Sequence, residues 1–117
     1  MINAAKKGDV AEITALVNHH APVNGLDEKG LSAMYWATFW GYVDVMEELH
    51  RLARGRERHD MLYKEYDGMN LLLVGAEQPE SVKWLHNKGL KDLSGVNDFC
   101  RQYGLMEYGK DGLHVHG

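Results

Sequence analysis

The sequence has one cysteine, two prolines and no long apolar run. Its single cysteine excludes an internal disulfide and a zinc site built from several cysteines. Pro22 and Pro79 both lie between predicted helices, because proline has a fixed φ and no N–H to donate. The longest apolar run, LLLVGA at 71–76, is far shorter than the roughly 20 residues that cross a bilayer. The start of the chain lacks the apolar segment of a signal peptide, so we expect a cytoplasmic protein with no membrane partner.

A strong excess of one charge is also absent. The formal net charge is −4, with 26% of the residues charged, so the chain as a whole does not attract nucleic acid or anionic lipid. Apolar residues make up 44% of the sequence, a share typical of globular proteins. A length of 117 residues suits one domain. We therefore expect one globular domain that does not bind nucleic acid.

Helical periodicity dominates what the sequence does contain. Apolar residues recur on one helix face in several segments, for example Val10, Ile13, Leu16 and Val17, and later Val45, Leu49 and Leu52. Short turn signals containing glycine separate these segments. The pattern predicts helices over 2–7, 9–18, 32–40, 43–53 and 94–103.

The predicted helices come in pairs at a fixed interval. Gly8 and Gly41, which form the turns inside two pairs, are 33 residues apart, and so are Ile13 and Met46 on the second helices. A helix–turn–helix unit of this length, joined to the next by a long β-like turn, has the ankyrin period. The stretches AAKKGDVAEITALVNHHAPVNGLDEKG and GLSAMYWATFWGYVDVMEELHRL therefore resemble ankyrin repeats.

This resemblance implies an all-α fold, an ankyrin-type helix–turn–helix solenoid with short hairpin-like connections and an irregular C-terminal cap. We expect a single ankyrin-repeat domain over 1–117. Its units would lie at about 1–26, 27–58 and 65–91, followed by a partial capping unit at 92–117.

The repeats depart from the family pattern in their signature and in one connection. Thr-Pro-Leu-His becomes SAMY in the second unit and NLLL in the third. Ser32 and Asn70 can still cap helices, because a side-chain oxygen accepts a first-turn N–H, but Leu73 cannot make the hydrogen bonds of the family's histidine. The link at 53–66 is longer than the family's connection. With the arginine-rich stretch RLARGRER it is expected to form a solvated helix end and loop. The alternative is a patch for an acidic partner or for nucleic acid, and the net negative charge argues against nucleic acid.

The C-terminal part resembles the family least. The helix over 94–103, with Ser94 as its N-cap and Gly104 as its left-handed stop, has no second helix. The tail LMEYGKDGLHVHG alternates apolar and polar residues, which predicts a short hairpin or an ordered tail. An incomplete last unit is expected because the end of a stack must cover its apolar face.

Aromatic residues are concentrated in one stretch, YWATFWGY at 35–42. It holds Tyr35, Trp36, Phe39, Trp40 and Tyr42. The resemblance places Phe39 and Trp40 at the end of an inner helix, on the surface by which the family usually contacts its partners, whereas Trp36 is expected in the core. The alternative is that the link at 53–66 folds over Phe39 and Trp40.

The resemblance implies a partner-binding surface made of inner-helix ends and hairpin tips. Its residues are Lys6, Lys7, Leu26, Glu28, Lys29, Leu31, Tyr35, Phe39, Trp40, Met69, Glu77 and Gln78, with Tyr66 beside Met69 at the third tip. Basic, aromatic and acidic side chains follow one another along it, which suits a protein partner better than a phosphate backbone. We therefore expect a protein–protein interaction module, with a small inhibitor or immunity-like protein as a narrower form. The chain is expected to be a monomer, and weak self-association through exposed aromatics is the alternative.

A small enzyme or metal-binding protein is the alternative function. His114 and His116 would share one face of a strand, but two ligands alone make a weak metal site. Cys100 lies on an apolar helix face with Val96, Phe99 and Tyr103, where burial raises the pKa of a thiol and makes it inert. No catalytic or nucleotide-binding motif is present. We expect no catalytic residue, no metal and no cofactor.

Overall fold

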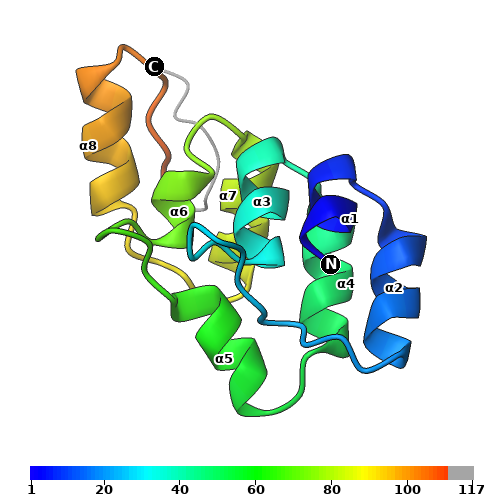
Figure 1. Cartoon of the computed structure of the whole chain (residues 1–117). Helices are drawn as coiled ribbons and strands as arrows, with labels where there is room; N and C mark the ends of the chain where they lie inside the picture. Colours follow the sequence, from blue (N-terminus) through cyan, green and yellow to red (C-terminus); the bar gives the residue numbers. More distant parts are fainter. Residues whose placement is uncertain (111–117) are drawn as a thin grey trace.

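The computed structural model of the chain describes residues 1–110. Within this part the regular elements are all helices, accompanied by two isolated β-bridges (Figure 1). The helices are α1 (Ile2–Lys7), α2 (Val10–Asn18), α3 (Ala33–Trp40), α4 (Val43–Leu52), α5 (Arg56–Tyr63), α6 (Leu71–Val74), α7 (Pro79–Asn87) and α8 (Ser94–Gln102). The molecule measures 47 × 26 × 25 Å, an elongated shape that fits a stack of units better than a closed bundle. The expected all-α solenoid is confirmed.

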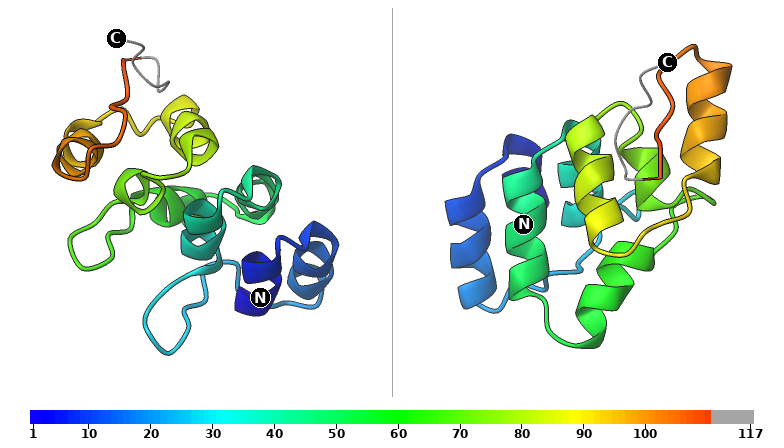
Figure 2. Two further views of the ribbon diagram at one scale, coloured as in Figure 1. Left: turned by 90° about the horizontal axis from the view of Figure 1, so that it is seen from above. Right: turned by 180° about the vertical axis from the view of Figure 1, so that it is seen from behind.

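The helices pack in two rows, which Figure 2 shows from above and from behind. In the inner row α1 packs against α3, α3 against α6, and α6 against α8. In the outer row α2 packs against α4, and α4 against α7. Three helix pairs therefore give one helix to each row, and α8 extends the inner row. No helix in residues 1–110 is long and apolar enough to span a bilayer.

Polar caps and a left-handed glycine set the ends of the inner helices. Ser32 Oγ accepts a hydrogen bond from the N–H of Tyr35 at 3.1 Å, and Asn70 Oδ1 accepts one from the N–H of Leu73 at 3.0 Å. Both predicted N-caps are thus confirmed. Gly41 has a φ of +78° in the turn between α3 and α4, a conformation that strains other residues. This turn returns the chain from the inner row to the outer row.

The apolar core lies between the two rows and continues from α1 to α8. Its largest fully buried side chains include Ile13, Met34, Met46, Leu49, Leu71, Leu72 and Leu85. A buried polar contact also joins the second and third units, because Ser81 Oγ donates a hydrogen bond to the carbonyl oxygen of Thr38 at 2.9 Å. Burial of apolar area between successive units is the main force that holds such a stack together.

The link at 53–66 contains helix α5 (Arg56–Tyr63), which corrects the expectation of a loop. Met61 and Leu62 are buried on one side of this helix. Arg58 joins α5 to the end of α4, with its Nε 2.9 Å from the carbonyl oxygen of Ala53 and 3.1 Å from the carbonyl oxygen three residues earlier. A helix end leaves such carbonyl groups without intrahelical partners, and a cation there is favourable. Tertiary contacts thus make the link helical.

The C-terminal helix differs from its prediction at two residues. Ser94 is the first residue of α8, and Leu93 is at the N-cap position. Asp92 Oδ1 accepts hydrogen bonds from the N–H of Ser94 at 3.1 Å and from its hydroxyl at 2.7 Å. Tyr103, expected on the apolar face, is 63% exposed. Gly104 has a φ of +69° and follows the helix in the expected left-handed conformation.

Tyr108 fixes the chain that follows α8. Its hydroxyl donates to the carbonyl oxygen of Ala76 at 2.8 Å, and its N–H donates to Asn97 Oδ1 at 2.7 Å. Asn97 Nδ2 in turn donates to the carbonyl oxygen of Tyr108 at 2.9 Å. The expected ordered tail is therefore present up to residue 110. The rest of the predicted hairpin, including His114 and His116, lies outside the described residues.

Candidate functional site

The inner row leaves a hollow of about 420 Å³ between α3, α6 and α8, which we call the inner groove. It is lined by Tyr35, Phe39, Trp40, Met69, Leu73, Val74, Ala76, Glu77, Gln78 and Phe99. Six of the residues predicted for partner binding lie in it, namely Tyr35, Phe39, Trp40, Met69, Glu77 and Gln78. Residues from the second and third units thus come together in one mostly apolar concavity.

Three aromatic rings of α3 form a row along this groove. Tyr35 and Phe39 are stacked, with ring centroids 6.4 Å apart and planes 4° apart. Phe39 and Trp40 meet edge to face at 4.9 Å. Phe39 is 42% and Trp40 is 49% exposed, so the link at 53–66 does not cover them, and that alternative is wrong. Because the opposite face of α3 is buried, these rings have a fixed position at the surface.

Sequence reasoning missed four apolar residues of the groove, which are Leu73, Val74, Ala76 and Phe99. Leu73 lies three residues after the N-cap Asn70, as Tyr35 lies three residues after Ser32, so an alignment of the two signatures would have found it. Val74 follows it on the short helix α6. Phe99 lies on α8. The resemblance is weakest in this part of the chain and did not predict that α8 contributes to the groove.

A smaller hollow of about 290 Å³ lies between α1 and the hairpin before α3. It is lined by Ile2, Asn3, Lys6, Asp27, Glu28, Lys29 and Trp36, which include the predicted residues Lys6, Glu28 and Lys29. Trp36 is half-buried here and not in the core as predicted. Its indole N–H donates to Asp27 Oδ2 at 3.1 Å, and the Nζ of Lys6 lies 4.4 Å from its ring centroid. The indole N–H needs an acceptor, and this requirement keeps the ring beside the polar hairpin.

Asp27 organises this hairpin. Its Oδ1 accepts hydrogen bonds from the N–H groups of Leu31 and Lys29, each at 2.9 Å. The Leu31 N–H, followed by the Trp36 indole, the Lys29 N–H and the charge of Lys6, holds the pKa of this carboxyl below its usual value, and partial desolvation opposes them. Asp27 therefore positions the residues around the smaller hollow. An Asp that opens the turn DEKG was a signal for this role in the sequence.

The remaining predicted residues lie outside both hollows. Lys7 is exposed at the end of α1, Leu26 is exposed in the hairpin, and Leu31 is half-buried against the core. Tyr66 was predicted at a hairpin tip, but it is buried, with its hydroxyl 2.7 Å from Ser32 Oγ. Tyr66 is therefore a structural residue and not a contact residue.

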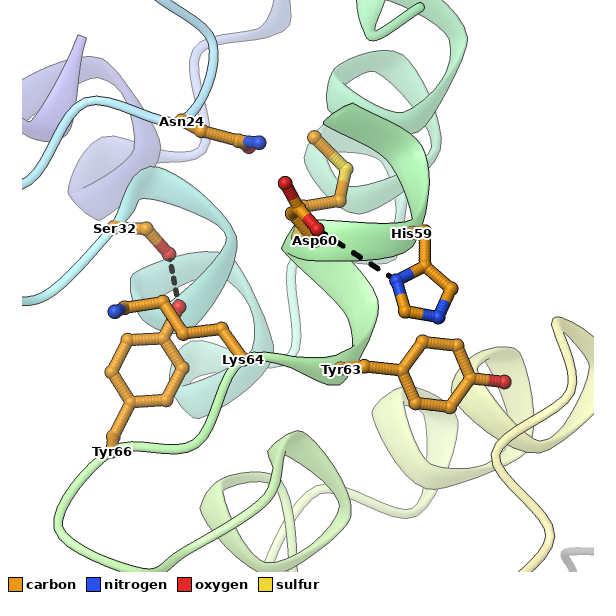
Figure 3. Close-up of a pocket in the computed structure, with 8 residues that line it drawn as sticks. Asn24, Ser32, His59, Asp60, Tyr63, Lys64 and Tyr66 are labelled. Atoms are coloured by element: carbon orange, nitrogen blue, oxygen red, sulfur yellow. Dashed lines mark hydrogen bonds and ion pairs between the residues drawn. The ribbon is translucent and has the colours of Figure 1, made fainter. Parts of the chain in front are cut away.

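A third hollow, of about 420 Å³, lies between α5 and the base of the hairpin (Figure 3). Its lining residues are Asn24, Ser32, His59, Asp60, Met61, Tyr63, Lys64 and Tyr66. Several of its polar groups already bind one another. Ser32 is bonded to Tyr66, and Asp60 Oδ1 lies 3.7 Å from His59 Nδ1. This hollow shares no lining residue with the inner groove.

Neither a metal centre nor a reactive thiol is supported in residues 1–110. In this range no group of three or more His, Cys, Asp or Glu is placed to hold a metal ion. Cys100 is fully buried, and this burial raises the pKa of its thiol. The alternative of a small enzyme or metal-binding protein therefore gains no support from the part of the chain that the structure describes.

Comparison with known proteins agrees with the stacked helix pairs. Residues 1–50 match the family described as ankyrin repeats (many copies). Osteoclast-stimulating factor 1 of Monopterus albus is 41% identical over 49 residues, which cover 42% of this chain and 23% of that protein. The Rattus norvegicus protein of the same name is 39% identical over 46 residues, covering 39% and 22%. The match thus spans less than a quarter of either relative. Residues 1–50 are therefore similar to ankyrin repeats, and the two rows of helices continue the same arrangement beyond the matched segment.

Proposed function

We propose that this chain binds another protein through the inner groove, with Phe39 and Trp40 as the main anchors. The observation that carries the proposal is the exposure of these two rings, which are 42% and 49% exposed on a helix fixed by its buried face. Large aromatic side chains at a surface supply much contact area and lose little rotamer entropy on binding, and they are frequent binding anchors. Ankyrin repeats suggest a protein–protein interaction module, in agreement with this proposal.

A rigid groove favours association. The rings stand on α3, which packs against α1, α4 and α6, and the Ser81–Thr38 hydrogen bond joins the two units that form the groove. Because the binding surface is preorganised, little conformational entropy is lost when a partner docks. We propose that contacts extend beyond the groove to the other predicted residues, which are Lys6, Lys7, Leu26, Glu28, Lys29 and Leu31.

Affinity capture with matched variants tests the proposal. Wild type, Phe39→Ala and Trp40→Ala would be immobilised and exposed to an extract of the source cells, and the captured proteins quantified by mass spectrometry. Tyr63→Ala is the control, because Tyr63 is an exposed aromatic residue on α5 that does not line the groove. We expect both groove variants to lose a protein that wild type and the control retain. Equal capture by all four would contradict the proposal.

A narrower form of this function is a small inhibitor or immunity-like protein that blocks one enzyme. It would use the same inner groove, which brings residues of the second and third units together in one concavity. If the captured partner is an enzyme, we expect its turnover to fall to zero at an equimolar ratio, and undiminished turnover would exclude this form. We also propose a cytoplasmic, monomeric chain, and a mass that rises with concentration in light scattering would contradict the monomer.

A further inference from the structure

The inner groove has one acidic residue and no basic residue. Glu77 is exposed in the turn between α6 and α7, and the other lining residues are apolar, aromatic or, in Gln78, a neutral amide. Glu77 forms no ion pair with any residue from 1 to 110. The groove thus combines an apolar surface with one unpaired negative charge.

Two of the three tryptophans have a lysine ammonium group over the ring. The Nζ of Lys6 lies 4.4 Å from the ring centroid of Trp36, and the Nζ of Lys88 lies 5.3 Å from that of Trp84. Trp40 has no cation over its ring among the residues that the structure describes, although it shares α3 with Trp36. Because the face of an indole attracts cations, Trp40 can accept one from a partner.

We propose that the partner segment places an arginine between Trp40 and Glu77, next to an apolar side chain that occupies the part of the groove lined by Tyr35, Met69 and Leu73. This inference rests on the proposed function and specifies the chemistry of the segment that the groove binds. Charge complementarity carries it, since the only charge of the groove is negative and its most exposed ring is open to a cation.

Arginine fits this position better than lysine. The planar guanidinium group can stack on an aromatic ring and donate two parallel hydrogen bonds to one carboxylate. An ammonium group is a compact and strongly hydrated charge that cannot do both with the same geometry. Trp40 and Glu77 line the same groove and come from neighbouring units, so one side chain that enters it can contact both.

Peptide selection on the full chain tests this chemistry. A phage library of random 12-residue peptides would be selected on wild type and counter-selected on Trp40→Ala. We expect peptides with an arginine next to an aromatic or large aliphatic residue. A selected peptide would then be synthesised with Arg, Lys or Glu at that position, and its affinity measured by fluorescence anisotropy.

The charge-swap arm separates the two proposals. On wild type, we expect Arg→Glu in the peptide to lower the affinity about 10-fold or more and Arg→Lys to lower it less, and on Glu77→Lys we expect the Glu peptide to bind better than the Arg peptide. Glu12→Lys changes the net charge equally on the outer helix α2 and should behave as wild type. Peptides that need Trp40 but are indifferent to Glu77 would overturn the inference and leave the proposed function intact. If the selection yields no peptide whose binding depends on Trp40, both the inference and the proposed function are contradicted.

Discussion

The hydroxyl oxygen of Tyr66 lies 2.7 Å from Ser32 Oγ and joins the hairpin of the third unit to the N-cap of the second. Ser32 Oγ at the same time accepts the N–H of Tyr35, and the rings of Tyr35 and Tyr66 lie 5.1 Å apart. In this chain the two hydroxyls therefore make an inter-unit contact where the family's histidine is missing. Tyr66 sets the position of the hairpin from which Met69 enters the inner groove.

Removal of the Tyr66 hydroxyl should weaken the stack without breaking it. We expect Tyr66→Phe to lower the free energy of unfolding by about 1 kcal/mol, because one buried hydrogen bond is lost while Ser32 keeps its bond to the N–H of Tyr35. Urea denaturation measures the change. Tyr63→Phe is the control, because Tyr63 is exposed on α5, and it should have no effect. Equal changes in both variants would show that the Tyr66–Ser32 contact does not stabilise the stack.

Glu48 should make stability depend on acid pH. Arg51, by its hydrogen bonds, and then the hydroxyl of Thr14 lower the pKa of Glu48 from 4.5 to about 2. A carboxyl whose pKa is depressed in the folded state stabilises that state above its unfolded pKa and loses this effect as the pH falls through the folded value. We expect Glu48→Gln to cost about 1 kcal/mol at pH 7, as for solvent-screened pairs.

Acid titration of the two proteins tests this assignment. The stability difference between wild type and Glu48→Gln should be constant above about pH 5 and shrink between about pH 4.5 and pH 2. Glu65→Gln, at an exposed site without an ion pair in residues 1–110, is the control and should track wild type. A difference that persists unchanged at pH 2 would mean that the charge of Glu48 is not the cause.

The anchoring of α5 should depend on Arg58. Its guanidinium binds carbonyl groups at the end of α4. Arg56 on the same helix is exposed, and its Nε lies 4.0 Å from Asp60 Oδ1, which is a long ion pair between exposed side chains. We expect Arg58→Ala to lower the free energy of unfolding by about 1.5–3 kcal/mol, the range for hydrogen bonds to charged groups, and to speed amide hydrogen exchange in α5. Arg56→Ala should change neither measurement. If both variants exchange alike, the contact with α4 does not hold the helix.

Substitution by alanine should change the free energy of unfolding in opposite directions at Gly75 and at Gly95. A Cβ on Gly75 would lie 2.9 Å from Thr38 Cγ2 and 3.1 Å from Ser81 Cβ, at the junction of the second and third units. We expect Gly75→Ala to cost about 1–3 kcal/mol, the range for overpacking. Gly95 lies in α8 with no atom within 4 Å of such a Cβ, so Gly95→Ala should stabilise the protein by about 0.5–1 kcal/mol through helix propensity. Thermal unfolding of both variants checks the two signs.

The interval of 33 residues predicted the two rows of helices well. The glycine turns mark where the chain passes from an inner helix to an outer helix. The N-caps at Ser32 and Asn70 could be predicted for the same local reason. Helix α5 could not, because its stability comes from the contacts of Arg58 with α4 and from the burial of Met61. These contacts join segments whose proximity the sequence pattern does not reveal.

The groove was predicted only in part, because some of its residues come together through contacts between distant segments. Phe39 and Trp40 follow from their place at the end of the inner helix, but Phe99 is brought to them by α8. Trp36 was assigned to the core from its apolar neighbours, but it is half-buried at the edge of the core, where its N–H binds Asp27. For Trp36 and Tyr66, a hydrogen bond of the aromatic side chain decided the position, and apolar periodicity does not reveal such a bond.

The most direct test of the account uses fluorine NMR on protein labelled with 5-fluorotryptophan. The three tryptophans give one resonance each, assigned by substituting each tryptophan with phenylalanine in turn. When a selected peptide or the captured partner is added, we predict that the Trp40 resonance shifts and that the Trp84 resonance, from the buried ring on the outer row, stays in place. A shift of Trp84 with an unchanged Trp40 would contradict binding at the inner groove.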